Sequence, residues 1–82
     1  MSSMLYNGKE KMDKIINHVK TYRLQSELTQ EALARLAGVS RQSIISIERN
    51  KYIPSLPLAL TMARIFSCTT DDLFQLKEDH NG

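Results

Sequence analysis

The residues of this 82-residue chain that could carry covalent or metal chemistry are few and scattered. His18 and His80 stand far apart in the sequence, without a metal-spaced cluster of other ligands around them. Cys68 is the single cysteine, which excludes an internal disulfide framework, and no glycine-rich phosphate loop is present. We interpret Cys68 as a small structural residue at a helix end, with a redox switch as the alternative. The sequence therefore argues against an enzyme and predicts neither a metal site nor a cofactor.

A second group of polar residues is suited to hydrogen bonding. Two short helical patterns between Gln30 and Arg49 meet at a Gly-Val-Ser turn. Thr29 and Ser40 precede these patterns, where each hydroxyl can accept a backbone N–H of the first turn, and Gly38 suits a left-handed cap. The apolar side is expected to comprise Leu33, Ala34, Leu36, Ala37, Val39, Ile44 and Ile47. The residues left to face outward are Arg41, Gln42, Ser46 and Arg49. Two capped helices around a tight turn, apolar behind and polar in front, indicate a helix-turn-helix unit.

The elements that must position this unit lie on both sides of it. A first helix pattern covers Lys14 to Ser26, and its start stays open. Either Asn17 caps the helix and leaves Ile15 and Ile16 extended, or the helix begins near Asp13.

After the unit, Asn50 to Ser55 form a connecting loop, and Ser55 is expected to cap a fourth helix. Its buried side is expected to comprise Leu56, Leu58, Ala59, Met62, Ala63, Ile65 and Phe66. Thr70 should cap a short fifth helix over 71–74.

Length and charge are consistent with one small domain that binds a polyanion. Residues 14–64 hold eight Lys or Arg against three Asp or Glu, whereas residues 65–82 hold one against four. We expect a flexible N-terminal extension over 1–13, a binding and dimerisation domain over 14–76, and a polar tail over 77–82. The native start stays open among three methionines, Met1, Met4 and Met12. No stretch approaches the roughly 18 apolar residues of a membrane span, and a lone cysteine fits a reducing cytoplasm.

Leu28 to Leu56, LTQEALARLAGVSRQSIISIERNKYIPSL, resembles the Cro and lambda-repressor-type helix-turn-helix family, also called the XRE family. The similarity continues with less detail from Asn17 to Leu76. The segments at family spacing are Gly38, Ile47-Glu48, Pro54-Ser55-Leu56 and Asp72-Leu73-Phe74. The resemblance implies an all-α, five-helix, lambda-repressor-like DNA-binding domain. Glu27 and Asn50 replace frequent family glycines; asparagine tolerates the left-handed conformation, while Glu27 leaves its turn open.

In this family the second helix of the motif lies in the major groove of double-stranded DNA, with its N-terminal residues at base edges. The resemblance implies base contacts by Arg41, Gln42 and Ser46. Arg suits guanine O6 and N7, and Gln suits adenine N6 and N7. Ile45 stands where a polar residue is commoner. It contacts a thymine methyl in one hypothesis and packs beside Arg49 in the other. The expected DNA backbone contacts are Gln30, Ser43, Arg49, Lys51 and Tyr52.

Two further expectations concern structure and assembly. By resemblance, Arg23 and Glu48 form a partly buried salt bridge between the first helix and the second helix of the motif, which is called the recognition helix. Short family members often dimerise through the fourth and fifth helices and the C-terminal segment. The expected interface residues are Leu58, Met62, Ile65, Phe66, Phe74 and Leu76, although most of these could simply close the core. A further hypothesis pairs Phe74 to Lys77 as a short strand with Ile15 and Ile16.

The resulting hypothesis is a homodimeric, cytoplasmic transcription regulator that binds an inverted-repeat operator and represses by blocking polymerase. Activation, as by restriction–modification controller proteins of similar size, is one alternative. An antitoxin-like or other protein-interaction module is another. RNA binding ranks third, because no aromatic stacking residues on a sheet support it.

Overall fold

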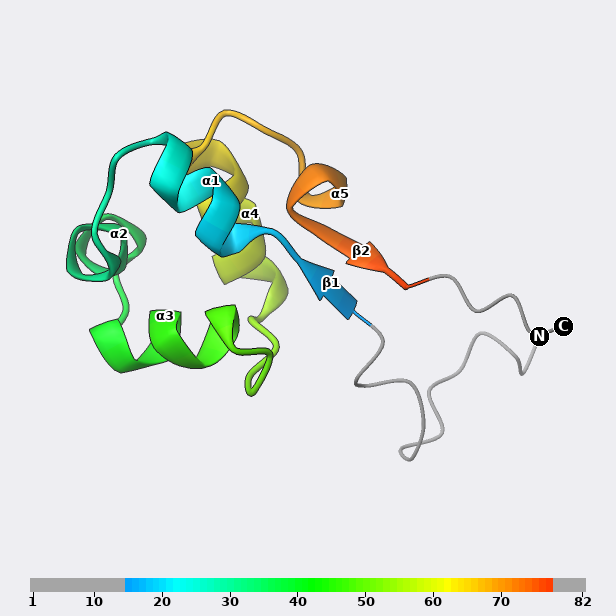
Figure 1. The fold of residues 1–82 in the computed structure, drawn as a ribbon, viewed down its shortest axis with the longest axis horizontal. Helices are drawn as coiled ribbons and strands as arrows, with labels where there is room; N and C mark the ends of the chain where they lie inside the picture. The colour runs from blue at the N-terminus through cyan, green and yellow to red at the C-terminus, as the bar shows by residue number, and fades with distance from the viewer. Residues whose placement is uncertain (1–14, 78–82) are drawn as a thin grey trace, which may run out of the picture.

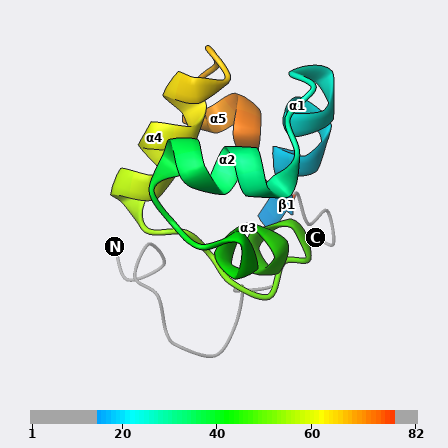
Figure 2. The same ribbon diagram turned by 90° about the vertical axis from the view of Figure 1, so that its left-hand side faces the viewer.

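The computed structural model describes residues 15–77. The elements in chain order are β1 (Ile15–Asn17), α1 (Val19–Gln25), α2 (Gln30–Ala37), α3 (Arg41–Glu48), α4 (Leu56–Ile65), α5 (Thr70–Leu73) and β2 (Phe74–Leu76). In Figure 1, α2 and α3 occupy one end of the molecule, and β1 and β2 lie side by side toward the other end. Figure 2 shows α2 above α3, with α1 on one side and α4 on the other. The expected five-helix domain with a short strand pair is confirmed.

Three predictions fall wholly or mainly outside the described residues. These are the flexible extension over 1–13, the position of the native start, and the polar tail, of which only Lys77 is described.

The helices begin at the hydroxyl caps that the sequence predicts. Thr29 Oγ1 accepts the backbone N–H of Ala32 at 3.0 Å, and Ser40 Oγ accepts that of Ser43 at 3.1 Å. Ser55 Oγ does the same for α4. Each bond satisfies one of the backbone donors that a helix start leaves without an intrahelical partner. These caps fix where α2, α3 and α4 begin.

The cap of the fifth helix lies one residue earlier than predicted. Thr69, not Thr70, accepts the backbone N–H of Asp72, and the Asp72 carboxylate accepts the N–H of Thr69 in return. This reciprocal capping box needs an acidic residue three positions after the cap. Thr69 has Asp72 there, whereas Thr70 would have Leu73.

Left-handed residues follow the helices. Gly38 has φ +76°, as its position after α2 predicts. Glu27, Asn50 and Ser67 adopt φ values of 59°, 58° and 56°. A left-handed backbone costs about 1–2 kcal/mol for a residue with a Cβ. Glu27 and Asn50 therefore adopt a left-handed backbone at positions where similar sequences often have glycine, although both residues suit this conformation less well than glycine does.

The core lies between α1, α2, α3 and α4 and is closed by α5. Its buried residues are Val19, Leu33, Ala34, Ile44, Ile47, Met62, Ala63, Phe66 and Leu73. Two core expectations are wrong, because Leu36 is 58 % exposed and Leu56 is 68 % exposed. Leu36 lies beyond the edge of the face on which Leu33 and Ala34 meet the other helices. Leu56 is the first residue of α4, and the first buried residue of this helix, Ala59, comes almost one turn later.

The two ends of the described chain pair as a short antiparallel sheet. Ile15 lies opposite Leu76, Ile16 opposite Gln75, and Asn17 opposite Phe74. This pairing confirms the strand hypothesis. It also excludes a helix that starts near Asp13, because residues 15–17 are extended and α1 begins at Val19. Asn17 Oδ1 accepts the backbone N–H of Val19 at 2.9 Å, so this side chain does help to start the helix.

Candidate nucleic-acid interface

The helix α3 has a buried side and an outward side, as its sequence pattern predicts. Ile44 and Ile47 are fully buried, while Arg41 and Gln42 are exposed. Ile45 and Ser46 are half-buried. Gln42 Nε2 lies 3.4 Å from Ser46 Oγ, one helical turn away, so these two side chains share one strip of the helix surface. This strip carries donors and acceptors that could meet the edges of bases.

A polar hollow adjoins the start of α3. It is lined by Lys20, Arg23, Thr29, Gln30, Glu31 and Arg41. Gln30 is the first residue of α2, so backbone N–H groups and the positive end of a helix dipole lie at this hollow. With the side chains of Lys20 and Arg41 beside it, the hollow suits an anionic oxygen such as that of a phosphate.

Lys20 is a candidate backbone contact that the sequence analysis missed. The available indication was its place in the first helix, three residues before Arg23. A single exposed lysine in a helix does not by itself indicate a DNA contact. Only the tertiary structure shows that Lys20 lies beside the starts of α2 and α3.

The other predicted backbone contacts do not form one cluster. Ser43 lies near the start of α3, half-buried, with its Oγ 3.1 Å from Ser40 Oγ. Arg49, Lys51 and Tyr52 are exposed and lie beyond the last turn of the same helix. The structure therefore places the predicted backbone contacts at both ends of α3, with the strip of Gln42 and Ser46 between them.

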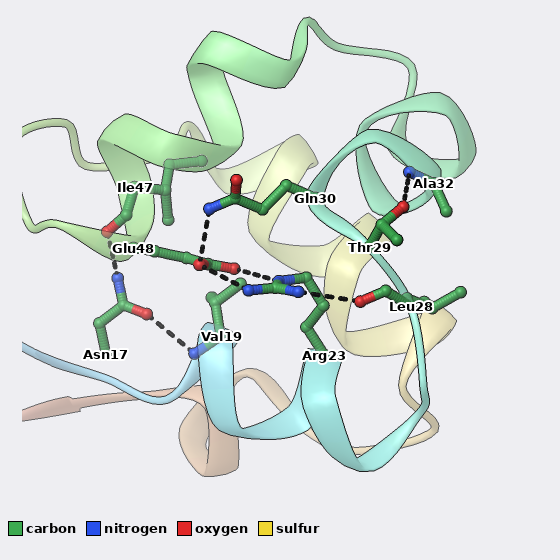
Figure 3. A network of polar contacts seen from close by, with 9 residues as sticks. All are labelled: Asn17, Val19, Arg23, Leu28, Thr29, Gln30, Ala32, Ile47 and Glu48. Carbon is green, nitrogen blue, oxygen red and sulfur yellow. Dashed lines mark hydrogen bonds and ion pairs between the residues drawn. The ribbon is translucent and has the colours of Figure 1, made fainter.

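An ion pair beneath this surface joins α1 to α3. Arg23 Nε donates to Glu48 Oε2 at 2.7 Å, and Arg23 Nη2 donates to Glu48 Oε1 at 3.2 Å. Figure 3 shows two further contacts in the network: Arg23 Nη1 donates to the Leu28 carbonyl, and Gln30 Nε2 donates to Glu48 Oε1. The side chains of Arg23 and Glu48 are only 9 % and 5 % exposed. The paired, two-point geometry holds the end of α3 against α1 and the start of α2.

The six residues predicted for dimerisation have different surroundings. Met62 and Phe66 lie in the core with 0 % and 9 % exposed, so their own chain leaves them almost no surface for a partner. We remove these two from the predicted interface. Leu58, Ile65 and Phe74 are half-buried against the core, and Leu76 is 80 % exposed.

Other apolar side chains lie exposed near the start of α4: Ile53, Leu56 and Leu60. Ile53 and Leu56 help to line a mainly apolar groove, together with Ile15, Pro54, Ala59 and Phe74. The sequence pattern predicts Leu56 in the core and gives no indication that Leu60 is exposed. The groove lies between the loop that follows α3 and the strand pair.

The described residues hold few groups suited to other chemistry. Within residues 15–77 no group of three or more His, Cys, Asp and Glu residues could hold a metal ion. None of the helices formed by these residues is both long and apolar enough to cross a membrane. Burial raises the pKa of the half-buried Cys68 thiol, the Asp72 carboxylate adds to the shift, and a hydrogen bond with Tyr22 opposes it. A raised pKa makes this thiol a poorer nucleophile near neutral pH.

Comparison with known proteins agrees with this geometry. Residues 19–73 match the family described as Helix-turn-helix, and the chain belongs to this XRE-type helix-turn-helix family of transcriptional regulators. It is 49 % identical over 63 residues to an uncharacterised HTH-type transcriptional regulator of Methanocaldococcus jannaschii, a match that covers 77 % of this chain and 96 % of that protein. It is 41 % identical over 64 residues to the uncharacterised HTH-type transcriptional regulator YgzD of Bacillus subtilis, covering 78 % and 97 %.

A solved structure shares the fold. The clp gene regulator ClgR from Corynebacterium glutamicum superposes with a TM-score of 0.62 at 20 % identity. The match covers 66 % of this chain and 57 % of ClgR. Together, the family and the fold establish a transcriptional regulator with a helix-turn-helix DNA-binding domain, a class of proteins that are generally not enzymes.

Proposed function

We propose that this protein is a homodimeric repressor that works in the cytoplasm by reading an inverted-repeat operator in double-stranded DNA through α3. The observation that carries the proposal is the outward strip of α3, where hydrogen-bonding side chains lie beside a hollow suited to phosphate. Sequence-specific readout needs both features, because phosphate contacts set the register of the protein and base contacts select the sequence.

The contacts divide into two groups. Arg41, Gln42 and Ser46 read base edges in the major groove, and a well-placed bidentate contact discriminates between bases by about 1–3 kcal/mol. Ile45 lies half-buried on the same helix and contacts a thymine methyl. The contacts to the DNA backbone come from Gln30, Ser43, Arg49, Lys51 and Tyr52, joined by Lys20 at the hollow.

Dimerisation brings a second copy of α3 to the DNA. One small module buries little surface on DNA, and a two-fold dimer doubles it on paired half-sites about one helical turn apart. The remaining predicted interface residues are Leu58, Ile65, Phe74 and Leu76, together with the exposed apolar residues Leu56 and Leu60. A dimer bound across a promoter excludes polymerase, and this makes repression the expected outcome.

The test is selection of binding sites from random duplex DNA, followed by salt titration of affinity for the selected sequence. We expect an enriched inverted repeat, and a steep loss of affinity with salt as phosphate contacts are screened. Arg41→Ala should relax sequence preference at one position of each half-site. Arg64→Ala is the matched control, because it removes the same charge from the exposed surface of α4.

Four results would contradict parts of this proposal. A well-folded protein that enriches no sequence would refute the readout and favour an interaction module. An enriched single half-site, with monomeric protein in solution, would refute the dimer. Increased transcription from a promoter that carries the operator would replace repression by activation. For the thymine contact, Ile45→Ser should relax the preference at one A·T pair, and unchanged specificity would remove Ile45 from the base contacts.

A further inference from the structure

Asn17 connects three parts of the fold through one short side chain. Its Nδ2 donates to the backbone carbonyl of Ile47 at 2.6 Å, and its Oδ1 accepts the backbone N–H of Val19 at 2.9 Å. The backbone of Asn17 belongs to β1, where it lies opposite Phe74 of β2. Figure 3 shows the amide between the start of α1 and the last turn of α3.

The carbonyl of Ile47 belongs to the end of α3. It also accepts the backbone N–H of Asn50 at 2.9 Å, so both of its lone pairs are engaged. The next residue, Glu48, is held by Arg23 and Gln30. Two consecutive residues at the end of α3 are thus anchored from outside the helix, one through its backbone and one through its side chain.

The position of this anchor matters because α3 is short and its base-reading residues start at its other end. Eight residues of helix span about 12 Å, so a tilt of a few degrees about the anchored end displaces Arg41 by up to about 1 Å. Bidentate hydrogen bonds to a base weaken steeply with such a displacement. Charge attraction to phosphates changes much less over the same distance.

From this geometry we infer that Asn17 is a positioning residue, which orients α3 for base readout without touching DNA. The inference rests on the proposed function, since it assumes that α3 reads base edges. Asn17 is itself held in place by the strand pair and by the bond from the His18 N–H to the Leu73 carbonyl at 2.9 Å. The strands at the two ends of the described chain therefore help to orient the recognition helix.

The side chain at this position must be both a donor and an acceptor, which gives two discriminating variants. Asn17→Asp keeps an acceptor for the Val19 N–H but replaces the donor with a carboxylate oxygen that repels the Ile47 carbonyl. Asn17→Ser also keeps an acceptor for the helix start, adds no charge, and is too short to reach Ile47. The Ile47 carbonyl keeps its bond from Asn50 in both variants, so both should remain folded.

The experiment measures the affinity of each variant for the selected operator and for a random duplex at the same salt concentration. We expect Asn17→Asp and Asn17→Ser to lose about tenfold in specific affinity while non-specific affinity changes less than about twofold. Ser55→Ala is the matched control, because it removes the side-chain cap of α4, which Ser55 makes with Leu58, and leaves the anchors of α3 intact. Its ratio of specific to non-specific affinity should equal that of the wild type.

A second readout needs no DNA. Amide hydrogen exchange and chemical shifts should change along α3 and in the turn around Asn50 in both Asn17 variants, and should not change there in Ser55→Ala. Unchanged amides in α3 would overturn the inference whatever the protein binds. Normal discrimination by both Asn17 variants would overturn it as well. Wild-type protein that selects no sequence, with the amides of α3 altered in the variants, would instead refute only the proposed function.

Discussion

Glu48→Ala tests the ion pair that fastens α3 to α1. The substitution leaves the Arg23 side chain, which is 9 % exposed, without its two-point contact to a carboxylate at 2.7 and 3.2 Å. Gln30 loses the same acceptor. One hydrogen bond, from Arg23 Nη1 to the Leu28 carbonyl, remains to compensate the buried charge.

The expected loss is large for so small a domain. Removing one side of a buried pair costs about 3–5 kcal/mol, because the remaining charge stays in a poorly solvated site. An 82-residue protein has a total stability of about 4–12 kcal/mol at typical values per residue. Each kcal/mol shifts the melting temperature of a domain of this size by about 4–8 °C, so Glu48→Ala should melt at least about 12 °C lower.

Urea denaturation at low temperature, followed by circular dichroism, measures the change in the free energy of unfolding. Glu31→Ala is the control, because Glu31 also pairs with an arginine, Arg35, but at 3.8 Å and with both side chains at least 70 % exposed. That variant should lose about 1 kcal/mol or less. The double variant Arg23→Met with Glu48→Leu should recover part of the loss, since no charge then stays buried.

DNA binding should weaken in Glu48→Ala through the loosened end of α3, although Glu48 lies beneath the proposed DNA surface. A Glu48→Ala protein with the melting temperature of the wild type would refute the assignment of the pair as a structural anchor. So would a double variant that is less stable than Glu48→Ala itself.

Three further predictions concern single positions. Gly38→Ala should lower the free energy of unfolding, measured by urea denaturation, by about 1–2 kcal/mol. The reason is backbone strain, because φ is +76° and no neighbouring group lies within 4 Å of the added Cβ. A larger loss would indicate a steric clash. Glu27→Gly should raise stability by up to about 1 kcal/mol by relieving the left-handed backbone, and a decrease would contradict that reason. At pH 8, Cys68 should be alkylated more slowly in the folded protein than in protein unfolded with urea, because burial raises the pKa of its thiol and leaves less thiolate. Equal alkylation rates would argue against burial of the thiol.

The sequence alone predicted the features that depend on neighbouring residues. Thr29, Ser40 and Ser55 cap helices because a hydroxyl reaches the backbone N–H three residues later, whatever the rest of the fold does. Gly38 and Asn50 take left-handed conformations for an equally local reason. The resemblance to a known family then added the fold and the paired partners Arg23 and Glu48, which no local rule could supply.

One wrong prediction, the cap of the fifth helix, arose because two neighbouring residues satisfy the same local rule. Thr69 and Thr70 are both good caps, and the choice between them depends on which has an acidic residue three positions later. The start of the first helix stayed open for a related reason. An extended stretch of three residues is too short to show a period, and only the pairing of Asn17 with Phe74 decided it.

The tertiary structure alone decided which apolar residues are core and which residues touch across the fold. Leu33 and Leu36 look alike along the sequence, yet one is fully buried and the other exposed, because burial depends on where distant helices pack. For the same reason Met62 closes the core, Leu56 faces outward, and Lys20 joins Arg41 at one hollow. The contact of Asn17 with Ile47 spans 30 residues of chain. Such a contact has no pattern in the sequence, because it exists only after β1 and α3 have been brought together by packing elsewhere.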